Sequence, residues 1–367
     1  MRGEVMPTWI WKYLINCKDI TEEVKQRIIS QYKEIGRDVF YRESQKKKVL
    51  PFAAHAMIQL NQDVGYWTKV FDTYHKRNHS ILEALNNAYL ALSNRGVKKM
   101  FVSENFGALL SGGADIGLFS SGDVDNYADP CEKERIYQAF EDIGYTRTER
   151  YSGHHQIAAE FYPPKSNDNL PEGFYISVDF YPLARLKLPC FIKADDFVEW
   201  DQTWCYKDTA IVLPPPTALM YICLLHISLH SFSRAPDIRL YIDLLNMTKT
   251  EVDYSSIKKW CITDRTCTRA AVAADICNKL LRTEFPHMLT ELSKRKKKVE
   301  KLVYDSEAKD LIYEPRGLKV LRIETACNDR SDFHGFLEIL FPKSDWMMET
   351  YGNSGLTAHL KHFKKVL

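Results

Sequence analysis

Two aspartates, Asp123 and Asp125, have the residue type and spacing with the clearest capacity for chemistry. On a β-strand, residues two positions apart point to the same side, so we expect both carboxylates to face one point in space. Crowded carboxylates repel each other, and proteins usually offset that repulsion with a cation or a proton. The plainer interpretation of Asp-x-Asp is a solvated turn or strand edge.

A third acid, Asp179, lies in the segment Ile176 to Phe180, in which apolar and polar residues alternate. This alternation predicts a strand with the aspartate at its centre. Three acids on neighbouring strands suit one or two Mg²⁺ ions, which prefer oxygen ligands. Two such metals can clamp the attacking and the leaving oxygen of a phosphoryl displacement.

Glycines and serines precede the acidic pair, in Ser111-Gly112-Gly113 and again in Ser120-Ser121-Gly122. Both stretches predict turns. Closely packed turns allow backbone N–H groups to face a phosphate. Their presence therefore favours a metal and phosphate site over a chance occurrence of two aspartates.

Histidines form a second group of candidates. His226 and His230 are four residues apart and share one face of a predicted helix, which is metal-ligand spacing. The interpretations are a hydrogen-bonded tie to Asp243, a nucleotide or acceptor contact, and a zinc site with Asp243 as third ligand. His154 and His155, on a predicted strand, could orient a phosphate or act as a base, or be half-buried structural residues.

The elements that must position these residues have local signals. Capping boxes predict helix starts at Asp19 and Ser80, and Asp129-Pro130 predicts a third. Cys131, just inside that third start, is the one cysteine whose position could lower its thiol pKa. Apolar patterning predicts strands at 99–103, 123–127, 155–162 and 174–181, and helices at 217–232, 237–247 and 269–281.

Composition excludes several classes of protein. The 367 residues carry 50 Lys and Arg against 48 Asp and Glu, a net charge of +2, which excludes general binding along duplex nucleic acid. The longest apolar run, 218–229, is too short to span a membrane. Nine cysteines with no CxxC pair, and no recognisable signal peptide, predict a reducing, cytoplasmic location.

The order of these features resembles the DNA polymerase β-like nucleotidyltransferase superfamily, and more closely the bacterial family of uncharacterised nucleotidyltransferases. The resemblance rests on the glycine-rich turns, Gly-Asp-Val-Asp, a helix, a strand and Ile-Ser-Val-Asp-Phe. Leu225 to His230 matches the family's two-histidine helix, and Arg239 to Asp243 matches the segment after it. Phe341-Pro342 and Trp346 to Tyr351 are similar to the family's ending, so the resemblance covers roughly residues 80 to 360.

The resemblance implies an α+β fold, with a small mixed-sheet core at 80–205 between helical regions at 1–79 and 206–367. It implies that Asp123 and Asp125 hold metal and triphosphate, and that Asp179 completes the site and helps to activate the acceptor hydroxyl. The expected metal is Mg²⁺, with Mn²⁺ as a substitute. The reaction implied is transfer of a nucleoside monophosphate from an NTP to a small molecule, a protein hydroxyl or an RNA end.

The sequence departs from the family pattern where cations are expected near the triphosphate. Phe106-Gly107 stands where Lys-Gly is common, and Ser120 and Ser121 stand where a basic residue often precedes the acids. Missing cations weaken the electrostatic case for tight NTP binding, and a degenerate relative that binds a nucleotide, peptide or partner without chemistry is the alternative. Further nucleotide contacts are expected from the residues of the turns and histidines: Gly107, or Ser111, Gly112 and Gly113, together with Ser121, His155, His226 and His230.

Overall fold

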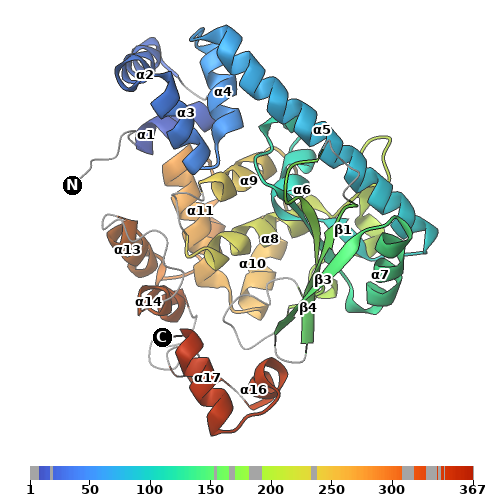
Figure 1. Cartoon of the computed structure of the whole chain (residues 1–367). Helices are drawn as coiled ribbons and strands as arrows, with labels where there is room; N and C mark the ends of the chain where they lie inside the picture. The colour runs from blue at the N-terminus through green and yellow to red at the C-terminus, as the bar shows by residue number, and fades with distance from the viewer. Residues whose placement is uncertain are drawn as a thin grey trace.

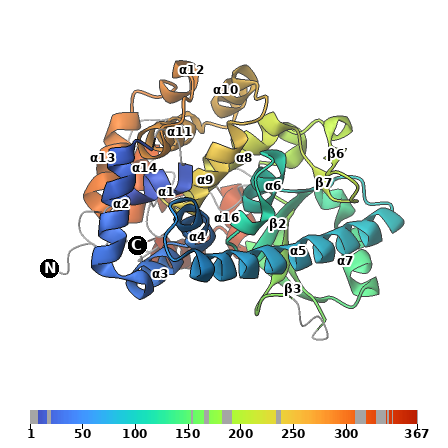
Figure 2. The same cartoon turned by 90° about the horizontal axis from the view of Figure 1, so that it is seen from above.

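The computed structural model describes residues 8–16, 20–152, 155–164, 170–181, 192–232, 238–307, 318–327, 337, 340–342 and 344–366. Helices precede and follow a sheet in the middle of the chain (Figure 1). The N-terminal helices are α1 (Thr8–Asn16), α2 (Glu22–Ile35), α3 (Arg37–Lys46), α4 (Leu50–Gln59) and α5 (Val64–Asn94). Viewed from above, these helices, α5 excepted, gather with α13 and α14 at the end of the molecule away from the sheet (Figure 2).

Within the described residues, five strands form a mixed sheet in the order β1-β2-β5-β4-β3. The strands are β1 (Met100–Val102), β2 (Asp123–Ala128), β3 (Thr146–Ser152), β4 (His155–Tyr162) and β5 (Tyr175–Asp179). The central pair, β2 and β5, is parallel, and the other neighbours are antiparallel. The predicted mixed α/β fold with flanking helices is therefore confirmed, and β3 is a strand that the sequence patterning did not indicate.

One face of the sheet is covered by α5 and by α7 (Lys133–Asp142) (Figure 1). Apolar residues of alternate strand positions pack there, for example Phe161 of β4, whose ring stacks on Phe140 of α7 with centroids 3.9 Å apart. The buried amide of Asn126 on the same face accepts a hydrogen bond from Tyr89 Oη of α5 (2.9 Å). Because this face is filled by the core, the residues at the other alternate positions are the ones available for function.

The remaining helices lie on the opposite side of the sheet or beyond it (Figure 1). Helix α6 (Glu104–Ser111) lies between β2 and the helices α8 (Pro216–Leu229) and α9 (Arg239–Met247). The short strands β6 (Trp204–Cys205) and β7 (Val212–Leu213) pair with each other. The later helices are α10 (Tyr254–Thr263), α11 (Cys267–Leu281), α12 (His287–Thr290), α13 (Lys296–Glu307), α14 (Leu318–Cys327), α16 (Ser344–Tyr351) and α17 (Leu356–Val366).

Of the three predicted helix starts, the one at Asp129 is confirmed and the one at Ser80 is wrong. Asp129 accepts from the Cys131 N–H (2.8 Å) and Pro130 follows it, as predicted. Ser80, by contrast, lies inside α5, which begins at Val64, so the prediction of a helix start at Ser80 is wrong and the expected boundary at 79/80 falls within one continuous helix. Asp19 lies outside the described residues, and Thr21 caps α2.

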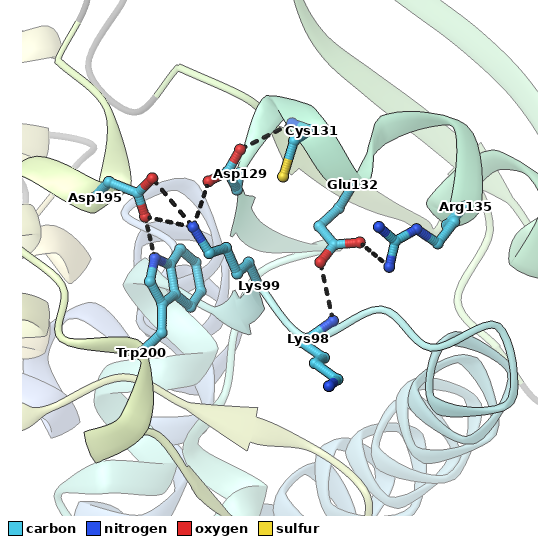
Figure 3. Close-up of polar contacts among 8 residues, drawn as sticks. All are labelled: Lys98, Lys99, Asp129, Cys131, Glu132, Arg135, Asp195 and Trp200. Atoms are coloured by element: carbon cyan, nitrogen blue, oxygen red, sulfur yellow. Dashed lines mark hydrogen bonds and ion pairs between the residues drawn. The ribbon is translucent and has the colours of Figure 1, made fainter.

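A cluster of polar side chains connects Asp195 and Trp200, which follow β5 in the chain, to Lys99 just before β1 (Figure 3). Lys99 Nζ donates to Asp129 (3.0 Å) and to Asp195 (3.3 Å), and Asp195 also accepts from Trp200 Nε1. The hydrogen bond between Cys131 and the Asp129 carboxylate raises the pKa of the thiol. The sequence-based suggestion of a lowered Cys131 pKa is therefore wrong, because the capping carboxylate outweighs the helix start.

No helix in the described part of the chain has the length and apolar character needed to cross a bilayer.

Candidate carboxylate site at the central strands

The register of β2 and β5 determines which side chains share the free face of the sheet. Asp123 pairs with Tyr175, Asp125 with Ser177, and Tyr127 with Asp179. Since alternate residues point to the same side, all three aspartates lie on one face. Asp179 is nevertheless four residues beyond Tyr175, so it is displaced from Asp123 by about 13 Å along the strands and lies diagonally from Asp125.

Asp123 and Asp125 lie close together on β2, while Asp179 is set apart from Asp123 along the sheet. Among the described residues, no group of three or more His, Cys, Asp or Glu side chains could hold a metal ion. Asp123 and Asp125 alone offer the oxygen donors that Mg²⁺ or Mn²⁺ prefers, and Mg²⁺ is commonly bound by one or two carboxylates plus substrate phosphates. The pair therefore offers two of the oxygen ligands that such a metal site would need.

Asp123 is held in place by two hydroxyl groups. Ser121 Oγ donates to Asp123 Oδ1, and Tyr175 Oη donates to Asp123 Oδ2 (3.0 Å). Burial and the negative charge of Asp123 raise the pKa of Tyr175 to about 12. The phenol therefore remains protonated near neutral pH and acts as a donor, which fixes the orientation of the Asp123 side chain.

A cation reaches this end of the site from helix α9. Arg239 Nη1 donates to Ser121 Oγ (3.0 Å), which places a guanidinium one hydroxyl away from Asp123. With its amide oriented to satisfy both neighbours, Asn105 accepts from Arg239 (3.0 Å) and donates to Asp243 Oδ2 (2.7 Å). The basic residue that the sequence lacks before the acidic pair is thus supplied from more than a hundred residues further on. Its only sequence signal is the Arg239–Asp243 spacing on one helix face.

Glu104 is a site residue that sequence reasoning did not select. It is the first residue of α6, it is buried, and its φ of 49° is in the left-handed region, which a non-glycine residue rarely adopts. Glu104 Oε1 accepts from Tyr127 Oη (2.7 Å), and Oε2 lies 3.1 Å from His226 Nδ1. Burial, then Glu104 and Asp179, raise the pKa of Tyr127, so this phenol also stays protonated.

Of the two predicted histidines, His226 on α8 lies beside Glu104, and His230, just after the end of α8, lies next to His226. His226 is buried against Glu104, and His230 is half-buried, with its ring 5.0 Å from that of His226. Both belong to the described residues, in which no three-ligand metal group occurs, so the zinc interpretation with Asp243 is wrong. His155 begins β4, but its side chain, like His154 as a whole, lies outside the described residues.

The glycines expected to form a phosphate turn belong to helix α6 and its end. The N–H groups of Gly107, Gly112 and Gly113 donate to Ser103, Ala108 and Leu110 carbonyls. A Cβ on Gly107 would lie 2.7 Å from Val102 O, and one on Gly112 would lie 2.6 Å from Asn246 O. These glycines allow α6 to approach β1 and α9, and their amides are not available to a phosphate. Ser111, the last residue of α6, has a buried hydroxyl without a hydrogen-bond partner.

Asp243 is a buried acid whose ionisation is disfavoured. Burial raises its pKa well above the usual value, and Glu104 adds to this effect while Arg239 opposes it. The folded protein thus prefers the neutral form, so this group stabilises the fold fully below pH about 3.8, the unfolded value, and the contribution is lost as the pH rises through the folded value.

Replacing Asp243 by asparagine should therefore flatten the pH dependence of stability. Asp243→Asn keeps the shape and the acceptor for Asn105 but cannot ionise. We expect the variant to lose less unfolding free energy than the wild type between pH about 4 and about 8, measured by urea unfolding. Parallel curves for the two proteins over this range would contradict the assignment.

Comparisons of the chain with protein-family models, with curated proteins and with solved structures gave no match. The functional argument therefore depends on the geometry of the carboxylate site.

Proposed function

We propose that this protein is a Mg²⁺-dependent nucleotidyltransferase, which moves a nucleoside monophosphate from an NTP to an acceptor hydroxyl and releases pyrophosphate. The observation that carries the proposal is the placement of Asp123 and Asp125 on one face of the central parallel strand pair, with Arg239 one hydroxyl away. Acids that hold a metal, next to a cation for the phosphates, are the parts that phosphoryl transfer requires.

The residues of the site have distinct roles in this proposal. Asp123 and Asp125 bind the metal through carboxylate oxygens, and Ser121 and Tyr175 keep Asp123 oriented for it. A Mg²⁺ ion held there would supply positive charge that stabilises the phosphate oxygens. Asp179 accepts the proton of the acceptor hydroxyl at a carboxylate oxygen. The acceptor is a small molecule, a protein hydroxyl or an RNA end.

A second candidate is a protein that binds the nucleotide without transferring it. It is favoured by Glu104, a buried acid at the start of α6, where the resemblance to the family leads one to expect a cation close by in the sequence. A negative charge at a helix start occupies the position that would otherwise attract an anion.

The test is transfer of label from each α-labelled NTP in the presence of Mg²⁺ and cell extract, read on gels for macromolecular acceptors and by chromatography for small ones. We expect Asp123→Asn and Asp125→Asn to lose about 10²-fold or more of the labelling, because charge stabilisation by a metal contributes several kcal/mol and about 1.4 kcal/mol is tenfold in rate. Asp72→Asn, an exposed position on α5, is the matched control.

Equal labelling by the wild type and the two site variants would overturn the proposed site. Titration calorimetry with Mg²⁺ and each NTP separates the two candidate functions. Wild-type binding that is lost in Asp125→Asn, without release of pyrophosphate in any extract, would favour the binding protein.

A further inference from the structure

Helix α17 carries large apolar side chains that face solvent. Leu356 is 77% exposed and Leu360 is 52% exposed, and with 3.6 residues per turn they share one face of the helix with Phe363. The exposed ring of Phe341 packs edge-on against the Phe363 ring, with centroids 5.4 Å apart. These four residues form the α17 patch. Among the residues that the structure describes, the other large exposed apolar side chains are isolated along the sequence, as is normal for a protein surface.

The opposite face of α17 attaches the helix to the rest of the protein. Ala358 and His362 are buried, and His362 Nδ1 lies 3.0 Å from Tyr351 Oη at the end of α16. Together α16 and α17 form the lower end of the molecule in Figure 1. The α17 patch is therefore a convex surface that points away from the protein.

The charged residues of α17 are all basic. From residue 350 to residue 367 the sequence contains three lysines, two histidines and no acid, although the whole chain is nearly balanced, with 50 basic and 48 acidic residues. Lys361 and Lys364 are exposed on the same helix as the two leucines. The surface that complements this helix is therefore apolar and negatively charged.

This combination of charge and shape favours an anionic lipid surface over a second copy of the chain. Two copies paired through the α17 patch would bring Lys361 and Lys364 close to the same lysines of the partner copy, and like charges repel. A bilayer accepts a convex helix, because apolar side chains enter the acyl boundary while lysines meet the phosphate head groups.

We propose that α17 binds the surface of an anionic lipid bilayer and lies in the plane of its interface. Leu356, Leu360 and Phe363 insert below the head groups, and Lys361 and Lys364 contact lipid phosphates. The attachment is peripheral and reversible, since so few apolar side chains insert. It does not depend on the carboxylate site, so it holds whether or not the protein transfers nucleotides.

Helix α10 provides a matched comparison within the same chain. It also has two exposed lysines, Lys258 and Lys259, and one exposed apolar residue, Ile262, which is 59% exposed. The exposed acids Glu251 and Asp253 lie just before this helix. Because α10 lacks a second exposed apolar side chain and has acids close by, we expect it not to bind lipid.

The experiment measures sedimentation of the full-length protein with vesicles of phosphatidylcholine, alone or with about 30% phosphatidylserine. We expect binding only to the anionic vesicles, and weaker binding at high salt. Leu356→Ser/Leu360→Ser should weaken binding at least about tenfold, because apolar burial is lost. Lys361→Gln/Lys364→Gln should weaken it to a similar extent. The α10 controls, Ile262→Ser and Lys258→Gln/Lys259→Gln, should bind like the wild type.

Unfolding midpoints show whether each variant is folded, and the substituted side chains are exposed, so little change is expected. No sedimentation of the wild type with anionic vesicles would overturn the proposal. Equal loss in the α10 lysine variant would do the same, since it would indicate general charge attraction. Wild-type binding by the leucine variant would exclude insertion. Binding of polyglutamate without binding of vesicles would assign the α17 patch to an acidic protein partner instead.

Discussion

Replacing Arg269 by methionine should lower the free energy of unfolding by about 3–5 kcal/mol, the largest stability effect that we expect. Arg269, on α11, is 1% exposed, and its Nη2 donates to Glu324 of α14 (2.6 Å). It also donates to Ser228 Oγ of α8 (3.2 Å). Removing the arginine leaves the buried Glu324 carboxylate without its cation, and desolvation of that charge is then uncompensated.

A double variant distinguishes the net contribution of the ion pair to stability from the free energy lost when only one partner is removed. Arg269→Met/Glu324→Leu removes both charges, and a buried pair replaced by apolar residues of similar size is often close to neutral. We therefore expect the double variant to recover most of the lost stability. Arg95→Met, which breaks the exposed pair with Asp142, should leave the unfolding midpoint close to that of the wild type, because water screens exposed charges.

Urea unfolding gives these values from the midpoint, provided that the slope is unchanged among the variants. A single-variant loss below about 1 kcal/mol, or no recovery in the double variant, would show that Arg269 does not act through Glu324. The pair also shows why the packing of the C-terminal helices could not be predicted from the sequence. Arg269 and Glu324 are 55 positions apart, and no local pattern connects them.

The elements that sequence reasoning predicted correctly are those specified by neighbouring residues. Local patterning predicts β1, β2 and β4, and clean alternation predicts β5. The Asp129 cap with Pro130 predicts the start of the segment that leads into α7. Each of these signals is complete within a few residues, so it does not depend on the rest of the chain. The common strand face of Asp123 and Asp125 follows from the same local rule.

Sequence-based predictions were wrong or missing where contacts with distant parts of the chain determine the local structure. Ser80 has capping-box spacing, but α5 continues through it because the helix packs against α4, η1 (Ile116–Leu118) and α7 along its length. β3 alternates poorly in its own sequence and is fixed by pairing with β4. Arg239 and Glu104 join the site only through helix packing, so their roles could not be inferred from spacing. The register that separates Asp179 from Asp123 is likewise a property of the assembled sheet.

The glycines of α6 provide the second large effect. We expect Gly107→Ala and Gly112→Ala each to lower the unfolding free energy by about 1–3 kcal/mol, because the added Cβ would meet backbone atoms of Val102 and Asn246. Alanine is favoured over glycine in helices by about 1 kcal/mol, so a net loss can be attributed to these close contacts. Gly122→Ala, where nothing lies within 4 Å of the added atom, should change stability by no more than about 0.5 kcal/mol.

The same three variants test where the phosphates bind. Since the Gly107 and Gly112 amides donate within α6, the folded fraction of each variant should bind tripolyphosphate like the wild type. Loss of that binding in Gly107→Ala at unchanged stability would indicate that the phosphates bind at the glycines of α6 and not at Arg239. Reduced stability with unchanged binding would instead assign the glycines to packing. In that case the glycines act indirectly: they let α6 lie close to β1 and α9, and this packing places Asn105 next to Arg239.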